Sequence, residues 1–198
     1  MKSLKGTKTL ENLLKAWAGE SQAVVQYGMF AAKAKKEGYV QVSNIFQETA
    51  DNEREHGKRF YRLILKGFEG AIPAEVGTTI SAGFIESAQT LDNLLFSING
   101  ETDEAVTVYP EYARVAAEEG FGEAAAAFKA IGSVEKHHAE RFQMLADNIE
   151  NGSVFNKKET VIWKCNNCGY IAEDTAAPEL CPACLHPRSY FQVEVDVY

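Results

Sequence analysis

The sequence predicts a mainly α-helical protein: a four-helix bundle with one long crossover, followed by a small C-terminal module held together by a metal. Three observations support this. The first 150 residues are rich in Ala, Glu, Lys and Leu and lack the alternation of strands. Glycines and prolines fall at intervals typical of helix ends. The chain's four cysteines, Cys165, Cys168, Cys181 and Cys184, cluster near its C-terminus.

The bundle is expected to contain four long helices. They are predicted near residues 9–37, 40–66, 90–119 and 121–150. Residues 67–89 contain Pro73 and four glycines, and we interpret them as a long connection with some helix of its own. Two short connections and one long one are typical of a bundle with a crossover. Pro110 is expected to kink or end the third helix.

The C-terminal region has a different character. "TVIWKC" and "YFQVEVDVY" carry the β-branched and aromatic residues of short strands. So small a segment cannot bury enough surface to fold alone, and a metal or disulfide staple is expected. The predicted organisation is therefore a bundle over 1–151, a linker over 152–160 and a metal module over 161–198.

Charge and hydropathy limit the classes of function. The net charge of −8 argues against nucleic acid or an anionic membrane as partner, because both require clustered Lys and Arg. No apolar run approaches the roughly 20 residues that span a bilayer. The N-terminus lacks the continuous apolar core of a signal peptide. A cytoplasmic location is expected.

Polar residues interrupt the apolar stripe of every predicted helix. The first stripe is Leu13, Trp17, Val24, Tyr27 and Ala31, and the third is Leu94, Ile98, Ala105, Val108, Tyr112 and Val115. The interruptions, from the first helix to the fourth, are Glu20; Glu53 and His56; Glu101 with Glu104 beside it; and Glu135 and His138. Several carboxylates buried together repel one another, so a positive partner is required.

A pair of metal ions is the best candidate for that positive partner, because no Lys or Arg lies on a stripe near this level. Glu53/His56 and Glu135/His138 share the Glu-x-x-His spacing, which puts both side chains on one helix face. Glu-x-x-His on two helices with Glu on two others is the ligand set of di-iron and di-manganese carboxylate bundles. One such motif alone usually marks a solvated face, but four coinciding interruptions favour metal.

Neighbouring polar residues receive simpler interpretations. His137 and Glu55 lie off the stripes and are expected on the surface. Tyr27 lies two turns from Glu20 on the same face. Core packing is the favoured interpretation of Tyr27, and proton donation is the alternative.

The cysteines form two Cys-x-x-Cys pairs, "CNNC" and "CPAC", separated by twelve residues. This spacing predicts a tetrahedral four-thiolate site and leaves zinc and iron open. Cys-x-x-Cys-Gly-Tyr followed by Cys-Pro-x-Cys is similar to rubredoxin, whose single iron carries one electron. His186, after the second pair, is interpreted as an exposed loop residue.

Together the two modules resemble the rubrerythrin family over nearly the whole chain. The resemblance implies a ferritin-like di-iron bundle with a rubredoxin-like tail, in which the four cysteines hold one iron. It implies that Glu53 and Glu135 bridge the two bundle irons. Glu101 and His138 would be terminal ligands of one iron and Glu20 of the other. That second iron would alternate between His56 when reduced and Glu104 when oxidised.

The resemblance also matches Tyr27 and Tyr109 to tyrosines near the family's site. The catalytic residues expected from it are Glu53, Glu135, His56, Glu104 and Tyr27. The implied function is a non-haem di-iron peroxidase for oxidative-stress defence that reduces hydrogen peroxide to water. Electrons would reach the bundle through the tail from an external NAD(P)H-dependent reductase or rubredoxin, because the chain lacks a nicotinamide-binding Gly-rich fingerprint.

Two other functions remain open. One is a ferroxidase or iron store of the ferritin type, which needs no electron-carrying tail. The other is a non-catalytic metalloprotein whose tail is a zinc ribbon that binds a partner. The tail is predicted to hang from the end of a helix about 45 Å long, at about 1.5 Å per residue. Since the di-iron site lies near mid-bundle, we expect a head-to-tail homodimer in which one chain's tail serves the other's bundle.

Overall fold

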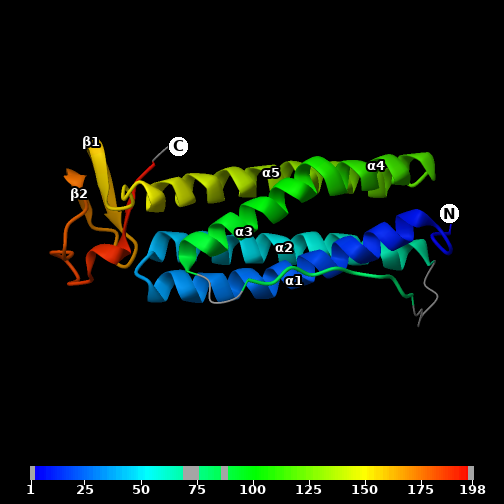
Figure 1. The fold of residues 1–198 in the computed structure, drawn as a ribbon, viewed down its shortest axis with the longest axis horizontal. Coiled ribbons are helices and arrows are strands. Elements are labelled where there is room, and N and C mark those ends of the chain that lie inside the picture. The colour runs from blue at the N-terminus through cyan, green and yellow to red at the C-terminus, as the bar shows by residue number, and fades with distance from the viewer. Residues whose placement is uncertain (1–2, 69–75, 86–88, 196–198) are drawn as a thin grey trace.

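The computed structural model describes residues 3–68, 76–85 and 89–195 (Figure 1). The helices are α1 (Lys8–Lys36), α2 (Val40–Gly67), α3 (Thr90–Asp103), α4 (Tyr109–Glu118) and α5 (Gly122–Glu150). A π-helical turn, Glu104–Val108, joins α3 to α4. The strands are β1 (Asn156–Cys165), β2 (Ile171–Ala176) and β3 (Phe191–Val193), with a 3₁₀ turn at Arg188–Tyr190. Within the described residues, no helix has the length and apolar character needed to cross a bilayer.

Local sequence signals set where the helices begin and end. The Thr7 side chain accepts a hydrogen bond from the Leu10 N–H and caps α1. Gln89 and Asp92 form a reciprocal capping box at the start of α3. Gly38, Gly120 and Gly152 follow helix ends with positive φ, which lets the chain turn away without a Cβ clash.

The helices form two hairpins that pack into one bundle. In Figure 1, α1 runs beside α2, and α3 with α4 runs beside α5. The crossover between the hairpins follows α1, where the Gln26 amide donates to the Gly83 carbonyl at 2.9 Å. Residues 76–85 of this connection contain neither helix nor strand, and 69–75 and 86–88 lie outside the described residues. The predicted bundle with a long crossover is confirmed.

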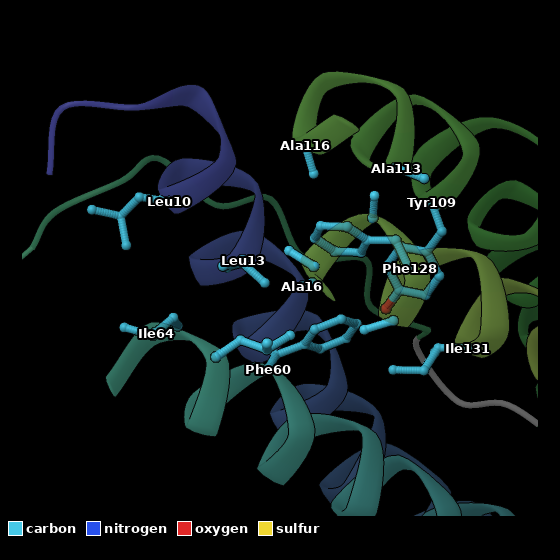
Figure 2. Packing of buried hydrophobic residues seen from close by; sticks show 14 of the residues in the cluster. Leu10, Leu13, Ala16, Phe60, Ile64, Tyr109, Ala113, Ala116, Phe128 and Ile131 are labelled. Atoms are coloured by element: carbon cyan, nitrogen blue, oxygen red, sulfur yellow. The ribbon is translucent and has the colours of Figure 1, made fainter. Parts of the chain in front are cut away.

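The bundle core consists of two apolar clusters rather than one. The first gathers around Leu13, Phe60, Tyr109 and Phe128, and Figure 2 shows their side chains converging from α1, α2, α4 and α5. The second gathers around residues that include Tyr27, Phe46 and Phe142. Both clusters are formed by side chains from the two hairpins. The residues that the sequence identified as stripe interruptions separate them.

The prediction that Trp17 belongs to the core is wrong. Trp17 is 39% exposed, and Ala16 occupies the buried position beside it. The indole instead packs against Tyr61 of α2 on the surface, with ring centroids 5.8 Å apart. Ala16 packs in the first apolar cluster, which contains the rings of Phe60, Tyr109 and Phe128.

Burial along the third predicted helix also departs from the 3.6-residue repeat that the sequence predicted. The Tyr109 N–H bonds to the Glu104 carbonyl, five residues back, so the π turn adds one residue to the helix. One residue rotates all later side chains by about 100°. Tyr109, Ala113 and Ala116 are therefore buried. Ala105, Val108 and Tyr112, which were predicted on the stripe, are only half-buried. Pro110 lies in the first turn of α4, where its missing N–H is tolerated.

The C-terminal module is a three-stranded antiparallel sheet in the order β2-β1-β3. Trp163 of β1 is fully buried, and its indole N–H donates to the Asp174 carbonyl at 3.0 Å. β1 begins at Asn156, inside the segment 152–160 that the sequence suggested as a linker. Residues 196–198 of the predicted last strand lie outside the described residues.

The module sits against the end of the bundle at the α1–α2 turn (Figure 1). Tyr39 stacks on Phe155 with an interplanar angle of 6° and ring centroids 6.4 Å apart. Beside them Gly38 has φ +88, and a Cβ placed there would lie 3.5 Å from the Ser189 Cβ. The α1–α2 turn therefore ends α1 and also contacts the C-terminal module.

Gly38→Ala is expected to lower the free energy of unfolding by about 1–2 kcal/mol, because an alanine is strained at positive φ. The matched control is Gly28→Ala. Gly28 lies within α1 with open space around a Cβ, so alanine should stabilise the protein by about 0.5–1 kcal/mol. Urea unfolding of both variants measures the difference. Equal effects of the two substitutions would contradict the role given to Gly38.

Candidate metal centres

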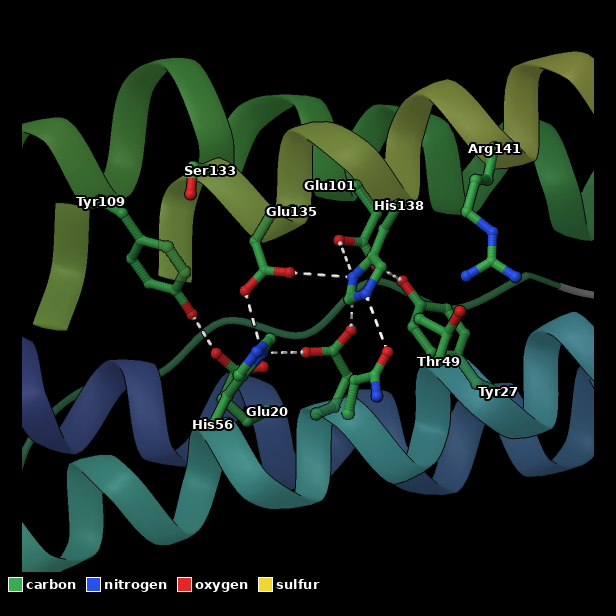
Figure 3. Close-up of polar contacts among 12 residues, drawn as sticks. Glu20, Tyr27, Thr49, His56, Glu101, Tyr109, Ser133, Glu135, His138 and Arg141 are labelled. Atoms are coloured by element: carbon green, nitrogen blue, oxygen red, sulfur yellow. Dashed lines mark hydrogen bonds and ion pairs between the residues drawn. The ribbon is translucent and has the colours of Figure 1, made fainter. Parts of the chain in front are cut away.

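The polar cluster lies between the two apolar cores and is almost completely buried. Figure 3 shows its side chains pointing toward one another from different helices. Glu20, Glu53, Glu101, Glu135 and His138 are each at most 2% exposed. They come from α1, α2, α3 and α5, so all four long segments contribute at the same level of the bundle. The structure thus brings together the side chains that interrupt the four stripes.

One group of possible ligands consists of Glu20, Glu53, His56 and Glu135. Each offers one ligand atom, and these atoms lie within 4.8 Å of one another. The His56 Nδ1 atom lies 2.7 Å from a Glu53 oxygen and 3.1 Å from a Glu135 oxygen. The Glu-x-x-His spacing places the first of these contacts on α2, and bundle packing supplies the second.

The second group consists of Glu53, Glu101, Glu135 and His138, again within 4.8 Å. The His138 Nδ1 atom lies 2.9 Å from Glu135, 3.0 Å from Glu53 and 3.4 Å from Glu101. Glu53 and Glu135 belong to both groups. Two carboxylates shared by two adjacent ligand groups are the arrangement needed to bridge a pair of ions.

Unpaired buried atoms test whether metals fit this cluster. Glu53 Oε1, Glu101 Oε2, both oxygens of Glu135 and His138 Nδ1 are buried and lack a partner with hydrogen-bond geometry. Such atoms are costly unless something satisfies them. They converge on two positions, and hard oxygen donors with one imidazole each suit iron or manganese. The donor set therefore fits a pair of metal ions.

The same geometry shifts the pKa values of the cluster. Burial raises the pKa of Glu20 well above its usual range, and the carboxylates of Glu53, Glu104 and Glu135 raise it further. Burial would lower the pKa of His138, but contacts with surrounding carboxylates outweigh it and raise the pKa to about 12. The pKa of His56 is raised to about 9 for the same reason. Without metal, two imidazolium ions therefore offset part of the negative charge.

Two buried tyrosines each support one outer carboxylate. The Tyr27 O–H donates to Glu101, and the Tyr109 O–H donates to Glu20 at 2.5 Å. Burial and the neighbouring carboxylates raise the pKa of both phenols, so both stay protonated. Tyr27 follows Glu20 by seven residues and Tyr109 follows Glu101 by eight. The π turn absorbs the extra residue and lets both tyrosines face the cluster.

Glu104 occupies a different position from the other predicted ligands. Among the described residues, neither four-membered ligand group includes it. It lies at the start of the π turn, where a Cβ placed at Gly19 would be 3.6 Å from its Oε1. It lines a cavity of about 370 Å³ together with Tyr109 and Tyr112. Burial raises its pKa well above the usual range. The structure therefore shows the arrangement in which His56 rather than Glu104 faces the ligands.

Asn52 is a neighbour of the site that sequence reasoning missed. Its Oδ1 lies 3.3 Å from the outer ring nitrogen of His138. A contact of this kind fixes the ring orientation of a metal-binding histidine. No sequence signal indicated it, because Asn52 and His138 lie on different helices. His137 and Glu55, predicted on the surface, are exposed.

The four cysteines form a second centre in the C-terminal module. Their sulfurs lie within 4.8 Å of one another. The Cys165–Cys184 and Cys168–Cys181 sulfur distances are 3.8 and 3.6 Å, far beyond a disulfide bond. Burial alone would raise the pKa of Cys184, but hydrogen bonds from the His186 backbone N–H and from neighbouring side chains together outweigh it and lower the pKa to about 6. The sulfurs are thus placed for one tetrahedral ion.

Family models match both modules. The model described as "Rubrerythrin" matches residues 11–146, and the one described as "Rubrerythrin, rubredoxin-like domain" matches residues 163–192. The chain belongs to the rubrerythrin family. It is 52% identical to the rubrerythrin of Clostridium perfringens over all of both chains. It is 47% identical to the rubrerythrin of Nitratidesulfovibrio vulgaris, covering 98% of this chain and 97% of that one.

Solved structures agree with this membership. The partially reduced state of nigerythrin has a TM-score of 0.62 at 30% identity, covering 98% of this chain and 92% of that one. A Desulfovibrio desulfuricans bacterioferritin has a TM-score of 0.64 at 21% identity, covering 74% and 82%, and shows the ferritin-like fold alone. This rubrerythrin-family chain therefore has the Glu/His cluster of a di-iron carboxylate site and the four cysteines of a rubredoxin-like site.

Tyr109→Phe is expected to weaken metal binding in the bundle about 10–100-fold, because Glu20 loses the donor that orients it. The control is Tyr112→Phe, which removes a half-buried phenol one turn along α4 that, within the described part of the chain, forms no hydrogen bond with a ligand. Competition with a coloured chelator measures both affinities. Equal affinities for the two variants would show that Tyr109 only packs.

Proposed function

We propose that this protein is a peroxidase that reduces hydrogen peroxide to water with two electrons and two protons. The observation that supports this most directly is the combination of centres in one chain. The bundle offers two adjacent ligand groups, and the tail offers a four-thiolate site suited to one-electron transfer. A protein that only stored iron would have no use for such a tail.

The geometry suggests a role for each ligand. Glu53 and Glu135 belong to both groups and would bridge the two irons. Glu20 and His56 would complete one iron site, and Glu101 and His138 the other. Glu104, whose Oε1 lies close to Gly19 of α1, would replace His56 as a ligand of that iron when its charge rises.

A reduced iron pair would supply the two electrons that break an O–O bond. The chain's own residues then orient the ligands and hold protons. Tyr27 and Tyr109 keep their protons on the phenol oxygens, directed at Glu101 and Glu20. The two apolar clusters on either side restrict water around the site. A proton-donor role for Tyr27 is therefore compatible with its position, although its packing against Phe46 and Phe142 is equally evident.

Electrons are proposed to arrive one at a time through iron held by Cys165, Cys168, Cys181 and Cys184. Their source would be an external NAD(P)H-dependent reductase or a rubredoxin. We further propose a head-to-tail homodimer, because the module lies at the bundle end while the ligand groups lie between the two cores (Figures 1 and 3). Full turnover by a protein that stays monomeric at micromolar concentration would contradict this pairing.

The test of peroxidase activity is anaerobic reduction followed by excess hydrogen peroxide, because the two bundle irons and the tail iron together give up three electrons and each peroxide accepts two. Both iron chromophores should reoxidise, and two moles of water should form for each mole of peroxide. Ferrous oxidation by oxygen, with iron accumulating as a mineral, would favour a ferroxidase of the ferritin type instead. A colourless tail containing zinc would exclude the electron relay.

A further inference from the structure

A solvent-open groove between α1 and α2 reaches Glu53, the proposed ligand that belongs to both metal positions. We call it the α1–α2 groove. Its volume is about 460 Å³, and Glu53 and Gly57 lie at its floor. Hydrogen peroxide is little larger than water, which occupies about 30 Å³. The groove is instead in the size range that holds organic ligands. Its volume therefore exceeds what the proposed substrate requires.

The walls and rim of the groove differ in character. Trp17 and Tyr61 form an aromatic wall, 39% and 47% exposed. Arg54, Lys58 and Arg62 follow one another at four-residue spacing along α2, so they line one side. An apolar wall below a row of cations is complementary to an apolar molecule that ends in a negative group. On a chain of net charge −8, such a row is a local exception.

The cations differ in how far they are already neutralised. Arg54 pairs with Asp51 at 2.6 Å and Lys58 with Glu55 at 2.5 Å. Both are exposed pairs within one helix, which are weak and exchange readily. Among the described residues, Arg62 has no ion-pair partner within 4.0 Å. Lys58 and Arg62 lie about 7.5 and 13.5 Å along the helix from Glu53, at about 1.5 Å per residue.

Gly57 keeps the floor of the groove open. A Cβ placed there would lie 3.4 Å from the Glu20 Cβ and 3.9 Å from Trp17 Cδ1. These are ordinary contact distances, so packing would accept alanine, and alanine is the better helix former. A larger side chain would instead fill the space between Trp17 and the ligands. Glycine at position 57 thus leaves the groove open toward the ligands, although alanine would make α2 more stable.

We propose that the α1–α2 groove binds organic hydroperoxides that carry a carboxylate, with Gly57 and Arg62 as specificity-determining residues. The carboxylate lies at Lys58 and Arg62, the apolar body lies against Trp17 and Tyr61, and the peroxide end points over Gly57. This inference rests on the proposed peroxidase function. Cleavage of the O–O bond gives one alcohol and one water for two electrons and two protons, which the same donor chain supplies.

Binding is tested without turnover, using the unreactive alcohol 4-(2-hydroxypropan-2-yl)benzoate and its neutral analogue 2-phenylpropan-2-ol. Calorimetry on the full iron-loaded protein should show tighter binding of the carboxylate. Lys58→Gln/Arg62→Gln should weaken that binding about tenfold and leave the neutral analogue unchanged. The control is Lys129→Gln, an exposed cation of α5 outside the groove. Equal binding of the two alcohols to the parent protein would overturn the proposal.

Reactivity is tested with three peroxides: hydrogen peroxide, cumene hydroperoxide and 4-(2-hydroperoxypropan-2-yl)benzoate. Gly57→Leu should slow iron reoxidation by the carboxylated peroxide at least tenfold more than by hydrogen peroxide, and Gly57→Ala should do so to a smaller degree. If Gly57→Leu fails to bind iron, Gly57→Ala decides. Failure of every peroxide with the parent protein would reject the proposed function itself. Reduction of hydrogen peroxide with no preference between the two organic peroxides would reject only this inference.

Discussion

Glu53→Ala is expected to remove both metal ions from the bundle and abolish the reaction with peroxide. Glu53 belongs to both ligand groups, and His56 and His138 each contact one of its oxygens. Its loss therefore weakens two sites together. We expect metal affinity to fall by more than the factor of about 100 that marks the loss of a supporting residue. Metal analysis and absorption spectra of the purified protein measure the effect.

The four-cysteine centre should survive this substitution, since it lies in a separate module. The matched control is Glu55→Ala, which removes an exposed carboxylate two residues away on α2. That variant should bind metal and react as the parent does. Retention of two bundle metals by Glu53→Ala would contradict the bridging role given to this residue.

Cys168→Ser is expected to have the opposite effect to Glu53→Ala: the C-terminal module should lose its metal while the bundle keeps both of its metals. Removing one of four sulfurs should eliminate iron binding in the module and disorder it, because the binding energy of a metal in so small a domain is its folding energy. The bundle should still bind its metals. Prereduced protein should still react once with hydrogen peroxide, while continuous turnover with an external donor should stop.

Trp163 provides the structural readout for this experiment. It is fully buried in the cluster that contains Cys165 and Cys181, so its fluorescence should shift to the red as the module opens. Thr175→Ser, an exposed change on β2, is the control and should shift neither fluorescence nor turnover. Full turnover by Cys168→Ser would show that electrons reach the bundle by another route.

Comparison of the predicted with the observed helices shows where helical periodicity predicts the burial of a side chain correctly and where it does not. The stripe interruptions at Glu20, Glu53 and Glu135 were evident because a 3.6-residue repeat assigns each position to a face. The same repeat failed beyond Glu104, where the π turn adds a residue and rotates the helix. It also placed Trp17 inside, because Trp17 and Ala16 are adjacent on the helix and only the packing of the other helices decides which of them is buried.

The sequence by itself determined the four helices, the crossover and the side chains at the centre of the bundle, because burying carboxylates and imidazoles on apolar stripes requires a compensating charge. It also determined the four-thiolate module through its spacing. Only the tertiary structure decided which ligands share a metal position and which tyrosine supports which carboxylate. The Tyr27 hydroxyl donates to Glu101 and the Tyr109 hydroxyl donates to Glu20. Each hydrogen bond joins two different helices, so it forms only when the helices pack together. The position of Glu104 beside Gly19 and the α1–α2 groove likewise exist only once the helices are assembled.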